Sequence, residues 1–322
     1  MQVGSSADTL TDRFAEALGA LWPGYRENGA RLGLAVSGGP DSLAMLLLAH
    51  RALPGRIAAA TVDHGLRPEN AAEADMVAAV CASLGVPHVV LPVVLAAGNI
   101  QAEARAARYA ALAGWAAGEG IFALATAHHA DDQAETLLLR LNRGSGVAGL
   151  AGVRARGVVP GTSLPLLRPL LGFRRAELGE VVRAAGIEAA NDPSNEDDRF
   201  DRARLRKALA GSGWLDVPAL AASAAHLADA DAALDWAAQR EWADCVQPAP
   251  MGLVYRPEAP RAIALRVITR IVRELDGDEP RGSAVARLFE SLLARQPASI
   301  GNLVARATPE GWSFTKAPTR RT

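Results

Sequence analysis

The 322-residue chain is predicted to be an α/β protein, with a domain built on a parallel sheet followed by a smaller, mostly helical C-terminal domain. Three observations predict this fold. Four apolar runs rich in β-branched residues alternate with helical stretches, polar or glycine-rich segments follow three of these runs, and long amphipathic helices dominate the last third of the chain. We expect the domains to span residues 1–215 and 216–322.

The runs expected as strands are Leu32–Val36, Ile57–Val62, His88–Leu95 and Ile121–Thr126. Helical spacing over Leu43–Ala52, Glu69–Leu84 and Gln101–Ala117 supplies the crossover connections that parallel strands require. Ligands of such sheets bind beyond the carboxyl ends of the strands. We therefore expect a site where Ser37–Gly39, Asp63–Gly65 and Ala127–His129 follow three of the strands.

The remaining segments are read in the same way. An amphipathic helix precedes the first strand, and residues 154–172, rich in Gly and Pro, form a loop or a hairpin. Further helices are expected over Arg174–Ala185, Asp216–Ala243, Arg261–Leu275 and Ser283–Ala294, and a terminal hairpin near Leu303–Phe314. Trp214, Trp236 and Trp242 are expected in the core or between domains.

Composition limits the function classes. The formal net charge is −1, so any RNA site must come from local basic patches rather than from an overall attraction. The two cysteines, Cys81 and Cys245, are far apart and predict neither a disulfide framework nor a zinc ribbon. No apolar run is long enough to span a membrane, and the N-terminus does not resemble a signal peptide. We expect a cytoplasmic protein with no membrane partner.

The densest signal is Ser37-Gly38-Gly39-Pro40-Asp41-Ser42, between the first strand and its helix. Unpaired N–H groups at a helix start attract anions, and the two glycines let the backbone bend and let a phosphate approach. Ser37 and Ser42 can add hydroxyl donors, and Asp41 can hold a metal ion on the phosphates. The alternative is an ordinary turn with a helix cap. A Walker loop is excluded because the segment has no lysine.

A second cluster lies in Ala127–Thr136. On a helix, Asp131, Asp132 and Glu135 share one polar arc, where they repel one another unless a cation lies among them. Mg²⁺ or a substrate ammonium would supply that charge. The alternative is a favourable effect of acids in a first helical turn. Zinc is a weaker alternative, because His128 and His129 are adjacent. The apolar face, Ala134, Leu137, Leu138 and Leu141, is expected to pack on the sheet.

The most basic short stretch contains Arg202, Arg204, Arg206 and Lys207. A solvated helix face explains most such stretches, but beside a nucleotide site we favour phosphate contacts. Gly144–Gly149 matches the dinucleotide fingerprint G-x-G-x-x-G, yet it follows a helix rather than a strand. We interpret it as a helix stop with a glycine turn.

Six motifs occur in one order: Ser37–Ser42, Val62–Arg67, Glu103–Tyr109, Ala127–Thr136 with Arg143–Gly146, Arg168–Leu171, and Asp192–Asn195 with Phe200 and 202–206. Together they resemble the tRNA(Ile)-lysidine synthetase family of the N-type ATP pyrophosphatase, or PP-loop, superfamily. The final third resembles the family's first C-terminal domain. One departure is Ala203, where the family usually has Asn, which removes one hydrogen bond near the nucleotide or the tRNA.

The resemblance implies a PP-loop ATPase domain and a C-terminal tRNA-recognition domain. It implies that ATP adenylates C2–O of the wobble cytidine of tRNA(Ile) with a CAU anticodon, and that free L-lysine then displaces AMP to give lysidine. The modified base would pair with A instead of G, and the tRNA would accept Ile instead of Met. ATP and Mg²⁺ are the implied cofactors, and a homodimer is one assembly that we consider.

The resemblance also implies residue roles. Ser37, Gly38, Gly39, Pro40 and Ser42 would hold the phosphates, Asp41 and Asp131 the Mg²⁺, and Asp63 and His64 the nucleotide. Asp132 and Glu135 would bind the cationic groups of lysine, ordered by His128 and His129. Arg105 and Arg108 would contact the phosphates or the flipped cytidine, and Arg202, Arg204, Arg206 and Lys207 the tRNA.

Three other functions share part of this pattern. A tRNA thiolase has the glycine loop but generally needs cysteines for sulfur transfer or an iron–sulfur cluster. Amidotransferase-type relatives lack the His-His-x-x-Asp-x-x-Glu-Thr pattern. A nucleotide sensor or RNA-binding protein without catalysis would not need a metal-holding acid beside the phosphates.

Overall fold

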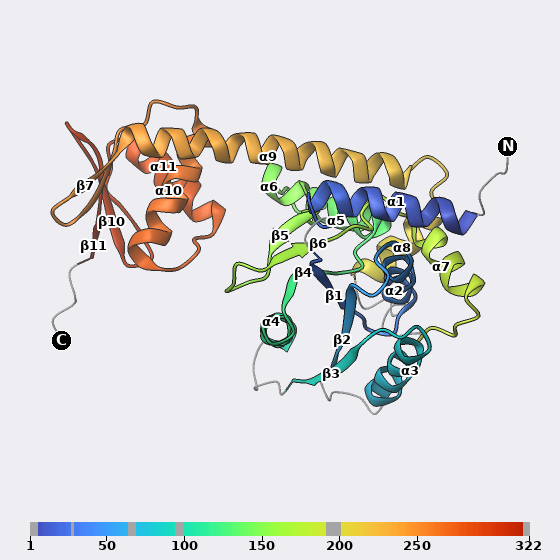
Figure 1. The fold of residues 1–322 in the computed structure, drawn as a ribbon. Helices are drawn as coiled ribbons and strands as arrows, with labels where there is room; N and C mark the ends of the chain where they lie inside the picture. Colours follow the sequence, from blue (N-terminus) through green and yellow to red (C-terminus); the bar gives the residue numbers. More distant parts are fainter. Residues whose placement is uncertain (1–5, 27–28, 64–68, 94–99, 191–200, 318–322) are drawn as a thin grey trace. The chain divides into compact units, whose positions relative to one another are not determined.

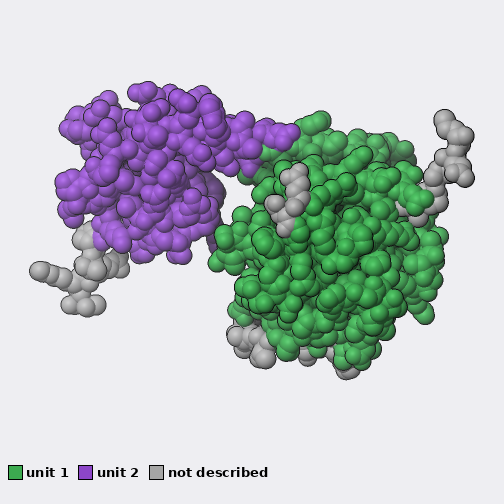
Figure 2. Space-filling view, in the orientation of Figure 1, with its two compact units in different colours: residues 1–228 green, residues 229–322 purple. Residues whose placement is uncertain are grey.

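The computed structural model describes residues 6–26, 29–63, 69–93, 100–190 and 201–317 (Figure 1). The chain forms two compact units, residues 1–228 and residues 229–322 (Figure 2). The division falls inside α9 (Val217–Cys245). The boundary expected after residue 215 lies just before the first residue of this helix. Each unit has its own hydrophobic core and is described by itself.

Unit 1 alternates strands and helices in the predicted order, which confirms the α/β class. Its first half contains α1 (Ser6–Leu21), β1 (Arg31–Ala35), α2 (Pro40–Ala52), β2 (Ile57–Asp63), α3 (Glu69–Ser83), β3 (His88–Pro92), α4 (Ile100–Gly118) and β4 (Ile121–Ala125). Its second half adds α5 (Ala130–Asn142), α6 (Val147–Leu150), β5 (Arg156–Val158), β6 (Pro165–Leu167), α7 (Arg175–Ala184) and α8 (Asp201–Ala210).

The six-stranded sheet has the order β3-β2-β1-β4-β6-β5 (Figure 1). All neighbouring strands are parallel except β5, which forms an antiparallel hairpin with β6. From β1 the chain proceeds to β2 and β3 on one side and later enters β4 on the other side. The switch point of the topology therefore lies between β1 and β4, and the loops after these two parallel strands lie at the same edge of the sheet, where ligands of such folds bind.

Alternating side chains of the strands face two cores, as expected of a sheet covered on both sides. Ile57 and Ala59 of β2 belong to the core formed with α1, α2, α3 and α7, whereas Ala58 and Ala60 belong to the core formed with α4. Gly33 allows α4 to approach β1 closely. A Cβ atom at this position would lie 3.0 Å from side-chain atoms of both Ile121 and Trp115.

One face of α5 is buried differently from the prediction. Ala134 is fully buried, but it packs with Ala130 against Val217 at the start of α9 rather than on the sheet. For Ala134 the expected contact with the sheet is therefore wrong. Leu141, in the last turn, is 58% exposed because this packing involves the first turns of α5.

Unit 2 contains a five-stranded antiparallel sheet with the order β7-β8-β11-β10-β9. The expected terminal hairpin is β10 (Leu303–Thr308) with β11 (Gly311–Lys316), to which β7 (Val246–Ala249), β8 (Gly252–Tyr255) and β9 (Ala298–Ile300) are added. The helices α10 (Arg261–Asp276) and α11 (Gly282–Leu293) share one core with this sheet.

The tryptophans are placed unequally. Trp312 lies at the centre of the core of unit 2, with ring centroids 5.9 Å from Tyr255 and 5.5 Å from Phe289. Trp242 packs against that core, but Trp214 and Trp236 are 83% and 62% exposed. These two side chains therefore lie outside the core of either unit, and their expected packing between domains stays a prediction. Within the described residues, no helix is both long and apolar enough to cross a bilayer.

Candidate active site

The glycine-rich loop Ser37–Ser42 leads from the end of β1 directly into α2. Gly38 has φ +86°, a conformation that side chains with a Cβ rarely adopt, and a Cβ there would lie 3.2 Å from the Met76 side chain. Gly39 is the N-cap of α2 and Pro40 its first residue. Within the described residues no side chain caps this helix, so its first N–H groups can bind an anion.

The two serines have different roles in this loop. The Ser42 hydroxyl donates to the Gly39 carbonyl at 2.9 Å and accepts from the Ser37 N–H at 3.1 Å. Ser42 is therefore used to close the loop, which stiffens the anion cradle. The Ser37 hydroxyl lies 3.3 Å from the Ser42 hydroxyl and is the one better able to turn toward a ligand.

His129 joins the glycine loop to the acidic helix. Its Nε2 lies 3.3 Å from Asp41 Oδ2 of α2 and 3.6 Å from Asp132 Oδ2 of α5. His129 is also the N-cap of α5. Its ring Nδ1 accepts a hydrogen bond from the backbone N–H of Asp132 at 3.4 Å, and the backbone N–H of His129 donates to Asp132 Oδ2 at 3.1 Å. The loop after β1 and the loop after β4 thus form a single site at the switch point.

The carboxylates around His129 set its charge. Burial by itself lowers the pKa of His129, but the neighbouring Asp41 and Asp132 outweigh burial and raise it above the ordinary value. Asp41 Oδ1 is buried and has no hydrogen-bond partner among the residues that the structure describes. A buried carboxylate oxygen without a partner is costly, and a hard cation is a suitable partner for it. Asp41 therefore fits the metal role that the sequence predicts.

Asp131 is engaged elsewhere. Its carboxylate accepts from Arg174 Nε at 3.2 Å and Nη2 at 3.1 Å, and from the Arg175 N–H at 2.8 Å. Burial raises the pKa of Asp131, but these hydrogen bonds and the charges of Arg174 and His129 together lower it by more. Arg174 thus supplies the cation that this carboxylate needs, and the geometry gives no support to Asp131 as a metal ligand. Among the described residues, no three His, Cys, Asp or Glu side chains form a metal-binding group.

Glu135 is buried in a two-point ion pair. Its side chain is 2% exposed, and Arg206 of α8 donates to Oε1 from Nε at 2.9 Å and to Oε2 from Nη2 at 3.4 Å. Burial lowers the pKa of Arg206, but the Glu135 hydrogen bond and the negative charges of Glu135, Asp132 and Asp41 together raise it by more. The neighbours on α8 are exposed: Arg202, Arg204 and Lys207, of which Arg204 pairs with Asp201 at 2.6 Å.

His128 has the opposite environment from His129. Its Nδ1 lies 3.1 Å from Thr126 Oγ1. Burial lowers its pKa to about 3, with further contributions from Arg168, Arg108, Arg105 and Arg202. The imidazole is therefore neutral near pH 7. Two adjacent histidines thus divide the site into an acidic part around His129 and a basic part around His128.

Some residues of the site were not assigned from the sequence. Arg168 follows β6, whose C-terminal end lies at the same sheet edge, and Arg174 caps α7. Arg168 begins one of the six motifs, Arg168–Leu171, and this motif is the sequence signal that points to it. The motif by itself does not predict a role for the side chain. Asp63 is the last residue of β2 and lies at this edge, whereas His64 is outside the described residues.

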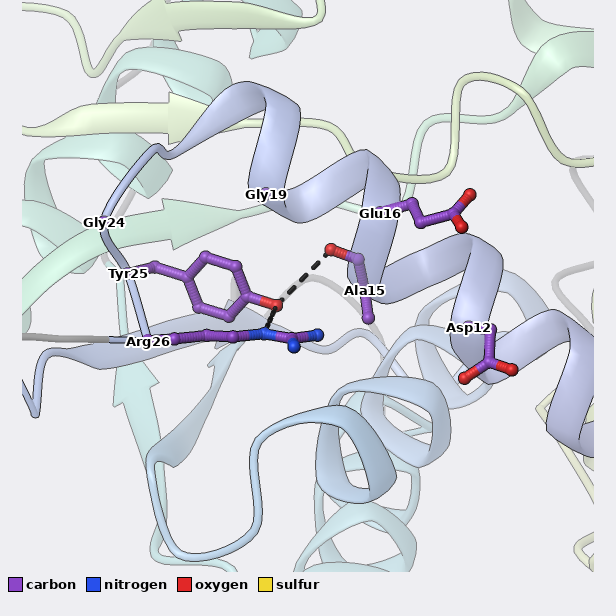
Figure 3. Close-up of a pocket in the computed structure, with 7 residues that line it drawn as sticks. All are labelled: Asp12, Ala15, Glu16, Gly19, Gly24, Tyr25 and Arg26. Atoms are coloured by element: carbon purple, nitrogen blue, oxygen red, sulfur yellow. Dashed lines mark hydrogen bonds between the residues drawn. The ribbon is translucent and has the colours of Figure 1, made fainter.

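A surface hollow of about 550 Å³ lies away from these residues, beside α1 (Figure 3). It is lined by Asp12, Ala15, Glu16, Gly19, Gly24, Tyr25 and Arg26. Tyr25 donates from its hydroxyl to the Ala15 carbonyl at 3.3 Å and accepts from Arg26 Nε at 2.8 Å, so its polar atoms are already paired. The candidate active site is the region after β1 and β4, because the titratable groups converge there.

Comparisons with known proteins identify the family of the chain. A family model described as a PP-loop domain matches residues 9–212. A tRNA(Ile)-lysidine synthase from Novosphingobium aromaticivorans is 47% identical over 99% of this chain and 97% of its own length. One from Zymomonas mobilis is 42% identical over 90% of each chain. Among solved structures, the U34-tRNA thiolase NcsA from Methanococcus maripaludis is 16% identical, with a TM-score of 0.55 over 68% of this chain and 78% of its own, which shows a shared fold.

Proposed function

This chain belongs to the tRNA(Ile)-lysidine synthase family of PP-loop proteins, and we propose on that basis that it ligates L-lysine to the wobble cytidine of tRNA(Ile) at the sheet edge after β1 and β4. The reaction uses ATP, releases pyrophosphate and AMP, and forms a C–N bond at C2. The observation that carries the proposal is the position of His129, which contacts Asp41 beside the glycine loop and Asp132 on the acidic helix.

In the first step, the cytidine O2 attacks the α-phosphorus of ATP and pyrophosphate leaves. Negative charge develops on the departing phosphates, and the glycine loop meets it with the N–H groups at the start of α2. Asp41 would hold Mg²⁺, which supplies positive charge beside these phosphates when it is bound. The stiff Ser37–Ser42 contact keeps the cradle in place before the nucleotide binds.

In the second step, the ε-amine of lysine attacks C2 and AMP leaves with the former O2. A free lysine carries an α-ammonium group as well as the reacting amine, so it needs acidic partners. Asp132 uses Oδ2 for the helix cap and would offer Oδ1 to lysine. Glu135 would bind the ligand together with Arg206, or after Arg206 moves aside.

The thiolase alternative is disfavoured by the cysteines. Cys81 lies in unit 1 and Cys245 in unit 2, and both are buried. Burial raises the pKa of each thiol to about 11, which keeps it protonated near pH 7. Protonated thiols in different units are poor candidates for sulfur transfer or for cluster binding.

Pyrophosphate release tests the proposal. The wild-type protein should release pyrophosphate from ATP with tRNA(Ile) transcript present, and sustained turnover should require lysine as well. A nucleotide sensor or a simple RNA-binding protein would release none, and that result would overturn the proposal. We extend the proposal to a cytoplasmic location, where tRNA, ATP and free lysine occur together, and we leave a homodimer as a prediction to be tested by light scattering.

A further inference from the structure

Gln133 is a buried amide in the first turns of α5, between the acids Asp132 and Glu135 of the same helix. Its side chain is 4% exposed and makes two hydrogen bonds to the backbone of Val153. Nε2 donates to the Val153 carbonyl at 2.8 Å, and Oε1 accepts from the Val153 N–H at 2.7 Å. This two-point contact, the Gln133–Val153 clamp, fixes both the distance and the orientation of the amide.

The segment that receives Gln133 is shaped for it and is tied to the sheet. Gly152 has φ +62°, and a Cβ atom there would lie 2.5 Å from Gln133 Oε1, so glycine is the residue that lets the amide approach. Further along the segment, Arg168 donates from its backbone N–H to the Ala155 carbonyl at 2.9 Å and from Nη1 to the Arg154 carbonyl at 2.6 Å. Because Arg168 directly follows β6, the clamp ties α5 to a strand of the sheet.

The start of α7 holds α5 from another side. Asp131 accepts hydrogen bonds from the Arg174 side chain and from the Arg175 N–H. Successive residues of an α-helix lie about 100° apart around its axis, so Asp131 and Gln133 lie about 200° apart. The two contacts therefore grip the first turns of α5 from nearly opposite sides. Loss of either contact would remove the resistance to rotation on that side.

We propose that Gln133 is a positioning residue, which fixes the rotation of α5 so that Asp132 and Glu135 meet the lysine substrate. Side chains of a helix reach about 5–6 Å from its axis, so a rotation of about 10° displaces a carboxylate by about 1 Å. A misplacement of this size can lower a rate about a hundredfold. The inference rests on the proposed function, because that function supplies the lysine.

The clamp should affect the two steps of the reaction unequally. The glycine loop, which would hold the ATP phosphates, is closed by contacts among Ser37, Gly39 and Ser42. These contacts do not involve α5, whereas Asp132 and Glu135 are carried by α5 itself. A rotation of this helix therefore displaces the partners of lysine and leaves the phosphate cradle in place.

The test compares Gln133→Met, Gly152→Ala and Tyr25→Phe with the wild type. Methionine matches the length of glutamine but cannot pair with the Val153 backbone. Gly152→Ala disturbs the same clamp without changing the sequence of α5, so it serves as the test if Gln133→Met fails to fold. Tyr25→Phe is the control for lost stability, because it removes a buried hydrogen bond to the Ala15 carbonyl, away from the site (Figure 3).

Three measurements report on the clamp. The first is kcat and KM for lysine with ATP and transcript in excess, and the second is pyrophosphate release in a single turnover without lysine, which reports adenylation alone. The third is hydrogen exchange of the Val153 N–H, which should be faster in Gln133→Met because the clamp is open. Melting curves are recorded for every variant.

We expect each clamp variant to lower kcat/KM for lysine at least about tenfold, while the adenylation rate stays within about twofold. Tyr25→Phe should lower Tm by about 2–4 °C and keep both rates within about twofold of the wild type. A lower Tm with unchanged lysine kinetics would give Gln133 a merely structural role and overturn the proposal. Equal losses in adenylation and in lysine transfer would also overturn it.

Failure of this inference is distinguishable from failure of the proposed function. If the wild type forms lysidine and the clamp variants keep its lysine kinetics, only the positioning role of Gln133 is wrong. If the wild type forms no lysidine, the proposed function is wrong and this inference falls with it.

Discussion

Replacing Arg206 by Met should destabilise unit 1 through an unpaired carboxylate. Glu135 is 2% exposed and depends on Arg206 for its two-point ion pair, with N···O distances of 2.9 and 3.4 Å. Removing one partner of a buried pair leaves the other charge without compensation, which costs about 3–5 kcal/mol. Because the Arg206 side chain is 32% exposed, water can reach part of the pair. We therefore expect a loss of about 2–4 kcal/mol in the free energy of unfolding.

The assay is urea or thermal unfolding followed by circular dichroism. For a unit of 228 residues, the expected loss corresponds to a fall in Tm of about 5–15 °C. Arg204→Met is the matched control on the same helix. Its pair with Asp201 is exposed on both sides, so its removal should cost less than about 1 kcal/mol.

A double-mutant cycle separates the pair from the rest of the side chain. Glu135→Gln removes the charge that Arg206 compensates, so Arg206→Met should cost at least about 1.5 kcal/mol less in that background. Additive losses would refute the reasoning, as would a single-variant loss below about 0.5 kcal/mol. Either result would mean that water, rather than Arg206, stabilises the Glu135 carboxylate.

Three further predictions concern the site. Asp41→Asn should lower pyrophosphate release at least about a hundredfold, because the Mg²⁺ that would neutralise the departing phosphates loses its protein ligand. An unchanged melting curve would show that the fold is intact. Normal turnover would exclude the metal role. Glu135→Gln should raise KM for lysine about tenfold or more while KM for ATP stays within about twofold, and equal changes in both would count against a lysine site. His128 has a pKa of about 3 in the folded protein, against an ordinary value of 6.5 in the unfolded chain. Between these two pH values the unfolded chain binds one proton more than the folded protein. The free energy of unfolding therefore falls as the pH drops from 6.5 toward 3. This contribution amounts to up to about 1.4 kcal/mol per pH unit. The free energy of unfolding of His128→Gln, measured at a series of pH values, should therefore fall less steeply below pH 6.5 than that of the wild type. The same slope in both proteins would contradict the neutral imidazole.

Most element positions in unit 1 could be predicted because local patterns determine them. Apolar runs mark β1, β2 and β4, and the helical period marks α2, α4 and α7 within one to three residues at each end. The glycine loop could be recognised because its backbone geometry requires particular residues. Gly38 has a positive φ, which favours glycine, and the N-cap position of α2 is occupied by Gly39, which has no side chain to cap the helix. These are local constraints that the sequence states directly.

The pairings within the site could not be predicted, since they join residues that are distant in the chain. Arg174 is 43 residues from Asp131, and Arg206 is 71 residues from Glu135. The sequence predicted that the acids need a cation among them, and the fold supplies arginines for two of the three. Only coordinates could separate His128 from His129, because their opposite environments arise from different neighbouring elements.

Unit 2 was the harder part to predict. Strands β7, β8 and β9 contain only three or four residues each, too few to show an alternating pattern. The absence of Trp214 and Trp236 from the core of either unit has a related reason. A large apolar residue predicts burial on average, but its exposure depends on which face of an element the fold covers.

The central claim is that the glycine loop and the acidic cluster form one pocket that activates a nucleobase with AMP and then joins it to lysine. Mass spectrometry of nucleosides from a tRNA(Ile) transcript tests this directly, after incubation with the wild-type protein, ATP and L-lysine. We predict a wobble cytidine heavier by one lysine less one water, and none of this product when ATP, lysine or the Asp41 carboxylate is missing. A cytidine of unchanged mass, from a folded protein that binds both ATP and the transcript, would contradict the account.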